Sequence, residues 1–199
     1  MLTHPILETF DVIFLDVNGT FMFGQDRFGP DQDYAATSRP PGGASLDGDR
    51  VELLTQQCID YMTRIGRDPK HFSDFPSVGE ALDVVVAPDR LSSVDRQKLT
   101  EVIAAHEIGQ VPKSYAEALR CFAESHRLGV VSNIWSEKSL WLQAFEEAGI
   151  EGLFETVVWS SEGRTIKPSQ AIFQRAIDAF DTVPERIVFV GDNPMRDID

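Results

Sequence analysis

The chain has 199 residues, 42% of them hydrophobic, and a formal net charge of −14. This length and composition suit one large globular domain, or one domain that carries a smaller insertion. The acidic balance argues against a nonspecific nucleic-acid binder, because a phosphate backbone is held by clustered lysines and arginines. It leaves anionic small molecules open as ligands, since a bound divalent cation can reverse the sign of the local field.

No apolar run approaches the roughly 18 residues that span a bilayer, and the N-terminal segment lacks the basic start of a signal peptide. We therefore expect no membrane association and a cytoplasmic location. Cys58 and Cys121 lie far apart at apolar positions of predicted helices, so both are expected to be buried free thiols. The four histidines show no metal-binding spacing, and most are expected at the surface.

The first predicted strand, Val12 to Leu15, is apolar at every position. Such a run is typical of a strand covered on both faces, as in the parallel sheet of an α/β protein. Asp16 follows directly, and then the turn-forming residues Asn18 and Gly19. In open parallel sheets, ligands bind beyond the carboxyl ends of the strands. Asp16 is therefore expected at the mouth of a site.

The segment from about 22 to 48 is rich in Gly, Pro, Asp and Ser, and this composition predicts a flexible loop. After it, apolar residues recur at helical spacing and predict a small helical bundle. Capping and stop signals bound these helices, among them the Ser77/Glu80 capping-box pattern and Gly66. The predicted helices span about 49–66, 77–87 and 92–108.

Beyond residue 112, helices and short apolar strands alternate. A helix capped by Ser114 is expected to end at Gly129, ahead of a strand at Val130. Helices that join short apolar strands predict a parallel sheet with right-handed crossovers, and hence an α/β fold. The later elements are helices at about 136–148 and 168–180, and strands at about 156–159 and 187–190.

Four polar clusters follow predicted strands or precede predicted helices: Asp16 with Asn18 and Thr20, Ser132 with Asn133, Lys167, and Asp192 with Asp197. Each cluster alone is ordinary turn or cap chemistry, but a short motif gains weight when its structural context agrees. In this order the clusters resemble the four motifs of the haloacid dehalogenase-like (HAD) superfamily. The resemblance covers residues 10–20 and 113–199, and the helices between them resemble that family's C1-type cap.

This resemblance implies a Rossmann-like core of residues 1–21 and 112–199, in which helices flank a parallel sheet, and an inserted all-helical cap at 22–111. The cap is expected to close over the strand ends and to select the substrate. Candidates that face the site are Phe21, Phe23, Arg27 and Trp135.

The resemblance leads one to expect another helix and strand after the fourth motif, so the C-terminal part of the core is expected to be missing from this sequence. Without them, the strand at 187–190 would form an exposed sheet edge, which is a liability for pairing and solubility. A partner, such as a second copy of the chain, is the other way to cover that edge.

The resemblance also implies Mg²⁺-dependent phosphoryl transfer from a small phosphorylated metabolite. Asp16 would attack the phosphorus to give an aspartyl-phosphate, because a carboxylate can split a difficult transfer into two easier steps. Lys167 would place a cation against this nucleophile and the phosphate. Phosphoryl oxygens would be bound by Thr20, Ser132 and Asn133, and Mg²⁺ would be held by Asp16, the backbone carbonyl of Asn18, Asp192 and Asp197.

Asn18 departs from the family pattern. Phosphatases of this superfamily usually have a second Asp at this position, which protonates the leaving oxygen and later activates water. An amide has no proton to exchange near neutral pH, and losing a general acid typically costs about 10²–10⁴-fold in rate. Three outcomes stay open: a substrate whose leaving group needs little protonation, a weak enzyme, or another acid in the loop, where the candidates are Asp26, Asp31 and Asp33.

Two other functions stay open. In 2-haloacid dehalogenases of the superfamily, the aspartate attacks carbon without a metal. Those enzymes usually carry Tyr where Asn18 stands and lack the Gly-Asp of the fourth motif, so Gly191 and Asp192 favour phosphoryl transfer. The second alternative is a catalytically impaired module that binds phosphate or metal, or serves in assembly.

Overall fold

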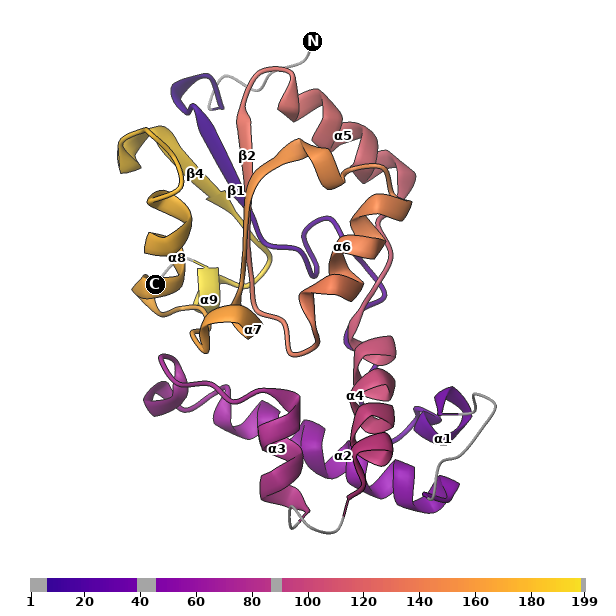
Figure 1. Cartoon of the computed structure of the whole chain (residues 1–199). Helices are drawn as coiled ribbons and strands as arrows, with labels where there is room; N and C mark the ends of the chain where they lie inside the picture. Colours follow the sequence, from indigo (N-terminus) through magenta and orange to yellow (C-terminus); the bar gives the residue numbers. More distant parts are fainter. Residues whose placement is uncertain (1–6, 39–45, 87–90, 198–199) are drawn as a thin grey trace.

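A computed structural model describes residues 7–38, 46–86 and 91–197. Its centre is a four-stranded parallel sheet with the strand order β3-β2-β1-β4 (Figure 1). The predicted α/β fold, a parallel sheet flanked by helices, is therefore confirmed. The strands are β1 (Val12–Leu15), β2 (Arg127–Ser132), β3 (Phe154–Trp159) and β4 (Ile187–Val190).

The side chains of β1 alternate between two apolar layers. Ile13 and Leu15 pack on one face with residues of α5 (Lys113–Ala123) and α6 (Lys138–Glu147). Val12 and Phe14 pack on the other face with residues of α8 (Gln170–Ile177). Both faces of the strand are thus covered, which explains why its sequence is a continuous apolar run rather than an alternating one.

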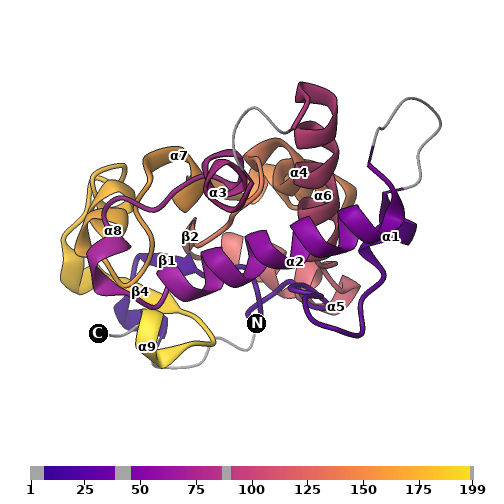
Figure 2. The same cartoon turned by 90° about the horizontal axis from the view of Figure 1, so that it is seen from below.

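The second part of the molecule is a layer of helices that lies beyond the carboxyl ends of the strands, with α2 running across them (Figures 1 and 2). We call it the helical layer; it contains α1 (Tyr34–Thr37), α2 (Gly48–Ile65), α3 (Val78–Val85) and α4 (Ser93–Glu107). The apolar stripe of α2 is buried against its neighbours at the predicted helical spacing, through Val51, Leu54, Cys58, Met62 and Ile65.

Two seams of backbone hydrogen bonds lie between the helical layer and the sheet. In the first seam, Phe23 and Gln110 exchange two backbone hydrogen bonds of 2.9 Å each, which join the two segments that connect the sheet to the helical layer. In the second seam, the Phe75 N–H donates to the Arg164 carbonyl at 2.7 Å, and the Ile166 N–H donates to the Phe72 carbonyl at 2.9 Å. The second seam therefore holds the helical layer directly against the segment after α7 (Ser160–Gly163).

Shorter helical turns complete the described structure. α9 directly follows the loop after β4, and α7 directly follows β3. Their bounds, with those of the 3₁₀ turns, are η1 (Leu7–Thr9), η2 (Pro69–His71), η4 (Glu151–Leu153), α7 (Ser160–Gly163), η5 (Pro184–Arg186) and α9 (Pro194–Asp197).

The structure corrects the predicted boundary between α5 and β2. The helix ends at Ala123 rather than at Gly129, and Gly129 lies inside β2. A Cβ at Gly129 would come 2.7 Å from the ring of Phe14 on the neighbouring strand. The glycine is therefore needed for close packing inside the sheet and does not end a helix.

One further expectation from the sequence was wrong. Cys121 is exposed, whereas Cys58 is buried as predicted. His106 is buried, and its ring packs edge-on against Tyr34 with ring centroids 4.7 Å apart. The segment predicted as a flexible loop at 22–48 contains the helix α1, and Tyr34 is 1% exposed. Residues 39–45 of that segment lie outside the described part of the chain.

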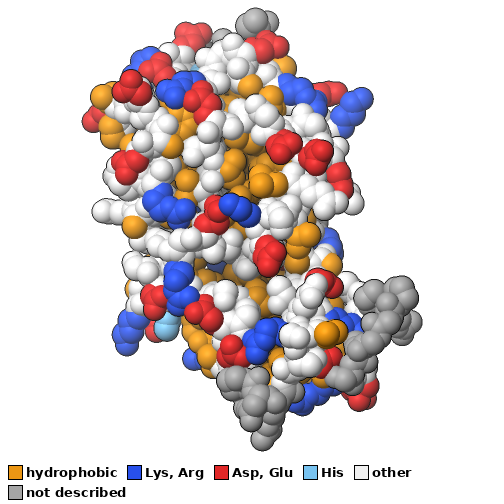
Figure 3. Space-filling model, viewed as in Figure 1, with side chains coloured by type: hydrophobic (Ala, Val, Ile, Leu, Met, Phe, Trp, Pro, Cys, Tyr) orange, Lys and Arg blue, Asp and Glu red, His pale blue; other side chains and the backbone are white. Residues whose placement is uncertain are grey.

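The surface agrees with the composition. On the face shown in Figure 3, acidic and basic side chains are interspersed over both parts of the molecule. β4 pairs only with β1 and forms an edge of the described sheet, where Val190 is 40% exposed. Among the described helices, none has both the length and the apolar character needed to cross a bilayer.

Candidate active site

The carboxyl ends of the strands bring three of the predicted polar clusters together. Asp16 directly follows β1, Ser132 ends β2, and Asp192 lies two residues beyond β4. The Asp16 N–H donates to the Val190 carbonyl at 2.9 Å, so the pairing of β1 with β4 fixes the backbone position of Asp16. Because all the strands run parallel, their ends share one edge, which is where ligands bind in such sheets.

Lys167 is a buried cation at this edge, and it is 2% exposed. Its Nζ lies 2.9 Å from Asp16 Oδ2 and 2.7 Å from Asp197 Oδ1. Burial of an ammonium group is costly unless opposite charges and hydrogen bonds compensate it. The lysine side chain therefore ties the first motif to the fourth.

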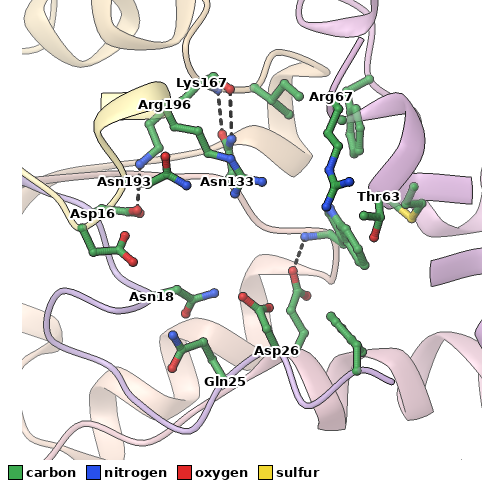
Figure 4. Close-up of a pocket in the computed structure, with 18 residues that line it drawn as sticks. Asp16, Asn18, Gln25, Asp26, Thr63, Arg67, Asn133, Lys167, Asn193 and Arg196 are labelled. Atoms are coloured by element: carbon green, nitrogen blue, oxygen red, sulfur yellow. Dashed lines mark hydrogen bonds and ion pairs between the residues drawn. The ribbon is translucent and has the colours of Figure 1, made fainter. Parts of the chain in front are cut away.

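Asn133 fixes the backbone of Lys167. Its Oδ1 accepts a hydrogen bond from the Lys167 N–H at 2.8 Å, and its Nδ2 donates to the Lys167 carbonyl at 3.2 Å (Figure 4). Ser132 acts on Asp16 instead, because its hydroxyl donates to Asp16 Oδ1 at 2.6 Å. The Val17 N–H donates to the same oxygen at 2.8 Å. Together these bonds orient both the carboxylate and the lysine.

Asp16, Asp192 and Asp197 form a cluster in which one carboxylate oxygen from each lies within 4.8 Å of the others. Burial and the nearby charge of Asp16 raise the pKa of Asp192 above its ordinary value. Both oxygens of Asp197 are engaged, Oδ1 by Lys167 and Oδ2 by the Asn193 N–H at 2.9 Å. Asp197 therefore positions the lysine and the loop after β4.

Glycines allow these carboxylates to approach so closely. Gly19 has φ +72°, and a Cβ there would lie 2.3 Å from Asp192 Oδ2. A Cβ at Gly191 would lie 2.1 Å from Asp197 Oδ2. The glycines of the first and fourth motifs are therefore required by the packing of the acidic cluster.

Buried polar atoms at this edge fit a bound ligand. Asn18 Oδ1 and the Thr20 hydroxyl are buried and have no hydrogen-bond partner in the described part of the chain. An unpaired buried polar atom is unfavourable in a folded protein and calls for an explanation. Oxygen donors are also the ligands that Mg²⁺ prefers, and Lys167 pairs with only two of the three carboxylates here. The residues present therefore fit a divalent cation with a bound phosphate.

A cavity of about 320 Å³ opens between this edge of the sheet and the helical layer. The sheet side contributes five of the predicted site residues, which are Asp16, Asn18, Asn133, Lys167 and Asp192. Ser132, Thr20 and Asp197 do not border it. From the helical layer, Thr63 and Arg67 near the end of α2 line the opposite side (Figure 4).

Of the three loop acids, only Asp26 borders the cavity. Burial raises the pKa of Asp26 to about 6, with Asp16 and Asp192 adding to the shift and Arg196 opposing it. Asp33 instead caps α1 by accepting a hydrogen bond from the Ala36 N–H at 2.7 Å. Asp31 is exposed. Of the three acids that the sequence offered in this segment, only Asp26 is therefore placed at the cavity.

Glu107, at the end of α4, is a cavity residue that the sequence analysis missed. Its carboxylate is 3% exposed and accepts hydrogen bonds from the N–H groups of Trp135 at 2.6 Å and Ser136 at 2.8 Å. Burial raises the pKa of Glu107 to about 7 against the lowering effect of these bonds. The residue anchors the loop after β2 to the helical layer. A lone Glu near a helix end offers no sequence signal for this role.

Three of the four residues predicted to face the site do not border the cavity. Phe21 is 1% exposed in the sheet core, and Phe23 packs on Tyr115 with ring centroids 4.7 Å apart. Arg27 donates to carbonyls at the end of α4, including that of Ala105, where a cation complements the helix dipole. Trp135 does line the cavity and stacks on Phe28.

Comparison with known proteins identifies the family. The family model for haloacid dehalogenase-like hydrolases matches residues 10–199. The chain therefore belongs to the haloacid dehalogenase-like hydrolases. Over 86 residues it is 33% identical to the phosphoserine phosphatase of Thermus thermophilus. That match covers 42% of the chain and 34% of the phosphatase, so it spans about a third of the length of this curated relative.

Solved structures show the same fold. The HAD hydrolase YfnB of Bacillus subtilis, bound to magnesium, has a TM-score of 0.55 and 13% identity over 95% of this chain and 82% of its own. A 2-haloacid dehalogenase of Pseudomonas syringae has a TM-score of 0.58 and 16% identity, over 95% of this chain and 80% of its own. A HAD phosphatase of Thermococcus onnurineus has a TM-score of 0.52 and 16% identity, over 94% of this chain and 80% of its own. Phosphatases and dehalogenases therefore share this fold, which does not distinguish between them.

Proposed function

We propose that this chain is a magnesium-dependent phosphohydrolase that acts on a small phosphorylated metabolite through an aspartyl-phosphate at Asp16. The observation that carries this proposal is the buried bridge of Lys167 between Asp16 and Asp197, beside the third carboxylate, Asp192. One lysine leaves this cluster with an excess of negative charge, which suits a dication and an anionic ligand. The partial likeness to a phosphoserine phosphatase supports the same chemistry.

The residues of the chain take separate parts in this reaction. The Asp16 carboxylate is oriented by Ser132 and the Val17 N–H, so that it can attack phosphorus. Lys167 is placed to stabilise the charge shared by the nucleophile and the phosphoryl group. The backbone N–H of Asn133, a residue that lines the cavity, would donate a hydrogen bond to a phosphoryl oxygen.

Asp16, Asp192 and the backbone carbonyl of Asn18 would hold Mg²⁺, with Asp197 supporting them through Lys167 and the Asn193 N–H. When bound, the ion neutralises charge between the Asp16 carboxylate and the phosphoryl oxygens. We further propose that the helical layer is a C1-type cap, and that Asn18 stands where phosphatases of the family carry the second Asp.

A panel of phosphates tests the proposal. With Mg²⁺, we expect phosphate release from acetyl phosphate and p-nitrophenyl phosphate, whose leaving groups need little protonation. EDTA or Asp16→Asn abolishes this release, while circular dichroism shows that the variant is folded. Phosphoserine is included because its leaving oxygen is strongly basic, so its turnover depends on a general acid.

Two results would contradict this function. Release of halide from a 2-haloacid in the presence of EDTA would assign attack on carbon, the chemistry of the dehalogenases. Binding of Mg²⁺ and phosphate in calorimetry, without turnover of any compound in the panel, would make the site a binding module. Either result would mean that the chain forms no aspartyl-phosphate at Asp16 during turnover.

A further inference from the structure

We propose that Asp26 is the general acid of this enzyme. It protonates the leaving oxygen, which the amide of Asn18 cannot do. This inference rests on the function proposed above. It extends that function to alkyl phosphates, whose basic leaving groups need a proton in the transition state.

The backbone around Asp26 is built to hold one conformation. Asp26 has φ +50° and is one of two non-glycine residues with positive φ in the described part of the chain. Its N–H donates to the Glu107 carbonyl at 3.1 Å, and the next residue, Arg27, donates its N–H to the His106 carbonyl at 2.9 Å. Residues held in such strained conformations are often functional, because the surrounding structure must over-determine them.

The Arg27 side chain strengthens this hold. Its guanidinium donates to the carbonyls of Gly24 at 2.6 Å and Ile108 at 3.3 Å, and also to that of Ala105. The short segment before and after Asp26 is thus pinned to the end of α4, at the first seam. These contacts explain why Asp26, and not the nearby Asp31, borders the cavity.

The position of Asp26 suits the departing group. In phosphoryl transfer the attacking and leaving oxygens lie roughly in line on opposite sides of phosphorus. With Asp16 attacking from the sheet, the leaving oxygen points into the cavity and away from the strand ends. Asp26 lines that cavity from the segment that leads to the helical layer, and Figure 4 shows it beyond Asn18 as seen from Asp16.

The charges around Asp26 suit an acid as well. Its residue surface is open to the cavity, yet the surrounding protein raises the pKa of the carboxyl group to about 6. The groups that act on it are Arg196, which favours the carboxylate, and Asp16, Asp192 and Glu107, which disfavour it. A pKa near the working pH is what general acid catalysis requires.

The two half-reactions balance. In the first, an Asp16 oxygen bonds to phosphorus, the bond from phosphorus to the alkoxy oxygen breaks, and the Asp26 proton passes to that oxygen. In the second, the Asp26 carboxylate takes a proton from the water that attacks the phosphorus, and the bond from phosphorus to the Asp16 oxygen breaks. Inorganic phosphate then leaves, and Asp16 and protonated Asp26 are restored.

The test is Asp26→Asn, assayed with phosphoserine and with acetyl phosphate in Mg²⁺. We expect phosphoserine turnover to fall by about 10²–10⁴-fold and acetyl phosphate turnover to change little. Asn is well tolerated at positive φ, so the variant should keep its fold. Asp31→Asn, an exposed acid of the same segment, is the matched control and should leave both activities unchanged.

A second variant separates lost chemistry from damaged structure. Adding Asn18→Asp to Asp26→Asn supplies an acid at the family's usual position, and we expect it to restore phosphoserine turnover. A wild type inactive on every phosphate of the panel would overturn the proposed function itself. A wild type active on acetyl phosphate but not on phosphoserine, or an Asp26→Asn variant in which both rates fall alike, would overturn only the role of Asp26.

A titration gives a readout independent of turnover. Carboxyl ¹³C NMR on the Mg²⁺-loaded protein, with Asp26→Asn used to assign the resonance, measures the pKa of Asp26 directly. We expect a pKa well above the ordinary value for aspartate, and a decline of phosphoserine turnover as the pH rises through it. An ordinary pKa in the Mg²⁺-loaded protein would overturn the proposal.

Discussion

The two sides of the cavity are built very differently. On the sheet side, the side chains of Lys167 and Asp197 are 1% and 2% exposed, and their charged atoms are paired with one another. On the opposite side, Arg67 is exposed, and its guanidinium makes no hydrogen bond or ion pair with the described part of the chain. At the strand ends, Lys167 thus forms a closed network of charges with Asp16 and Asp197, whereas Arg67 from the helical layer is an unpaired cation within the described part of the chain.

This difference suggests that the sheet side carries the reaction and that the helical layer recognises the substrate. In the reaction we propose, the charges that would act on phosphorus are held by strand ends and buried hydrogen bonds, because small misplacements of catalytic groups are costly. The free side chains of the helical layer, Thr63 and Arg67, can meet the rest of a substrate without disturbing that network. Substitutions on the two sides should therefore differ both in size and in kind.

The largest effect is expected at Lys167. Lys167→Met leaves Asp16 and Asp197 without their cation, and we expect the free energy of unfolding to fall by about 3–5 kcal/mol. The control is Lys138→Met, which removes an exposed ion pair with Glu162 and should cost under about 1 kcal/mol. Urea unfolding at neutral pH measures both. Equal losses in the two variants would contradict the contrast between buried and exposed charges.

A smaller and more specific effect is expected at Gly19. Gly19 and Gly24 share φ +72°, so alanine should cause a similar backbone strain of about 1–2 kcal/mol at either position. Only at Gly19 would the new Cβ meet Asp192 Oδ2, at 2.3 Å, because nothing lies within 4 Å of the Cβ at Gly24.

Calorimetry with Mg²⁺ distinguishes the two variants. Gly19→Ala should weaken Mg²⁺ binding by about 10–100-fold, as is typical when a residue that supports a metal ligand is changed. Gly24→Ala should bind Mg²⁺ like the wild type. Unchanged affinity in Gly19→Ala would mean that Asp192 has no part in holding the ion.

Much of the sheet side could be predicted from the sequence. β4 has the predicted bounds Ile187–Val190, and β1 is the apolar run that precedes Asp16. In a parallel sheet, strand order hardly matters to the result, because every carboxyl end reaches the same edge. For this reason, Asp16, Ser132 and Asp192 lie at one edge of the sheet, and Lys167 reaches this edge from the segment after α7.

The helical side could not be predicted in the same way. Asp26 differs from Asp31 only through the hydrogen bonds that pin its segment to the end of α4, which is about 80 residues away in the chain. Glu107 and Arg67 carry no local signal, since each is an ordinary polar residue at a helix end. Their roles depend on how two separate parts of the chain dock, which neither periodicity nor capping patterns encode.

The smallest expected effect lies at the second seam, where Arg164 forms ion pairs with Asp74 and Glu80, both at 2.7 Å. Hydrogen bonds from Ser77 and Arg164 lower the pKa of Glu80 to about 2. Because the folded pKa lies below the ordinary 4.5, the stability contributed by this carboxylate is present above pH 4.5 and is lost as the pH falls toward 2. Glu80→Gln should therefore destabilise the protein at neutral pH, by under about 1 kcal/mol since solvent screens the pair. In urea unfolding, the difference in unfolding free energy between Glu80→Gln and the wild type should shrink below pH 4.5. A difference that stays constant down to pH 3 would show that the ionised Glu80 carboxylate does not help to hold the helical layer.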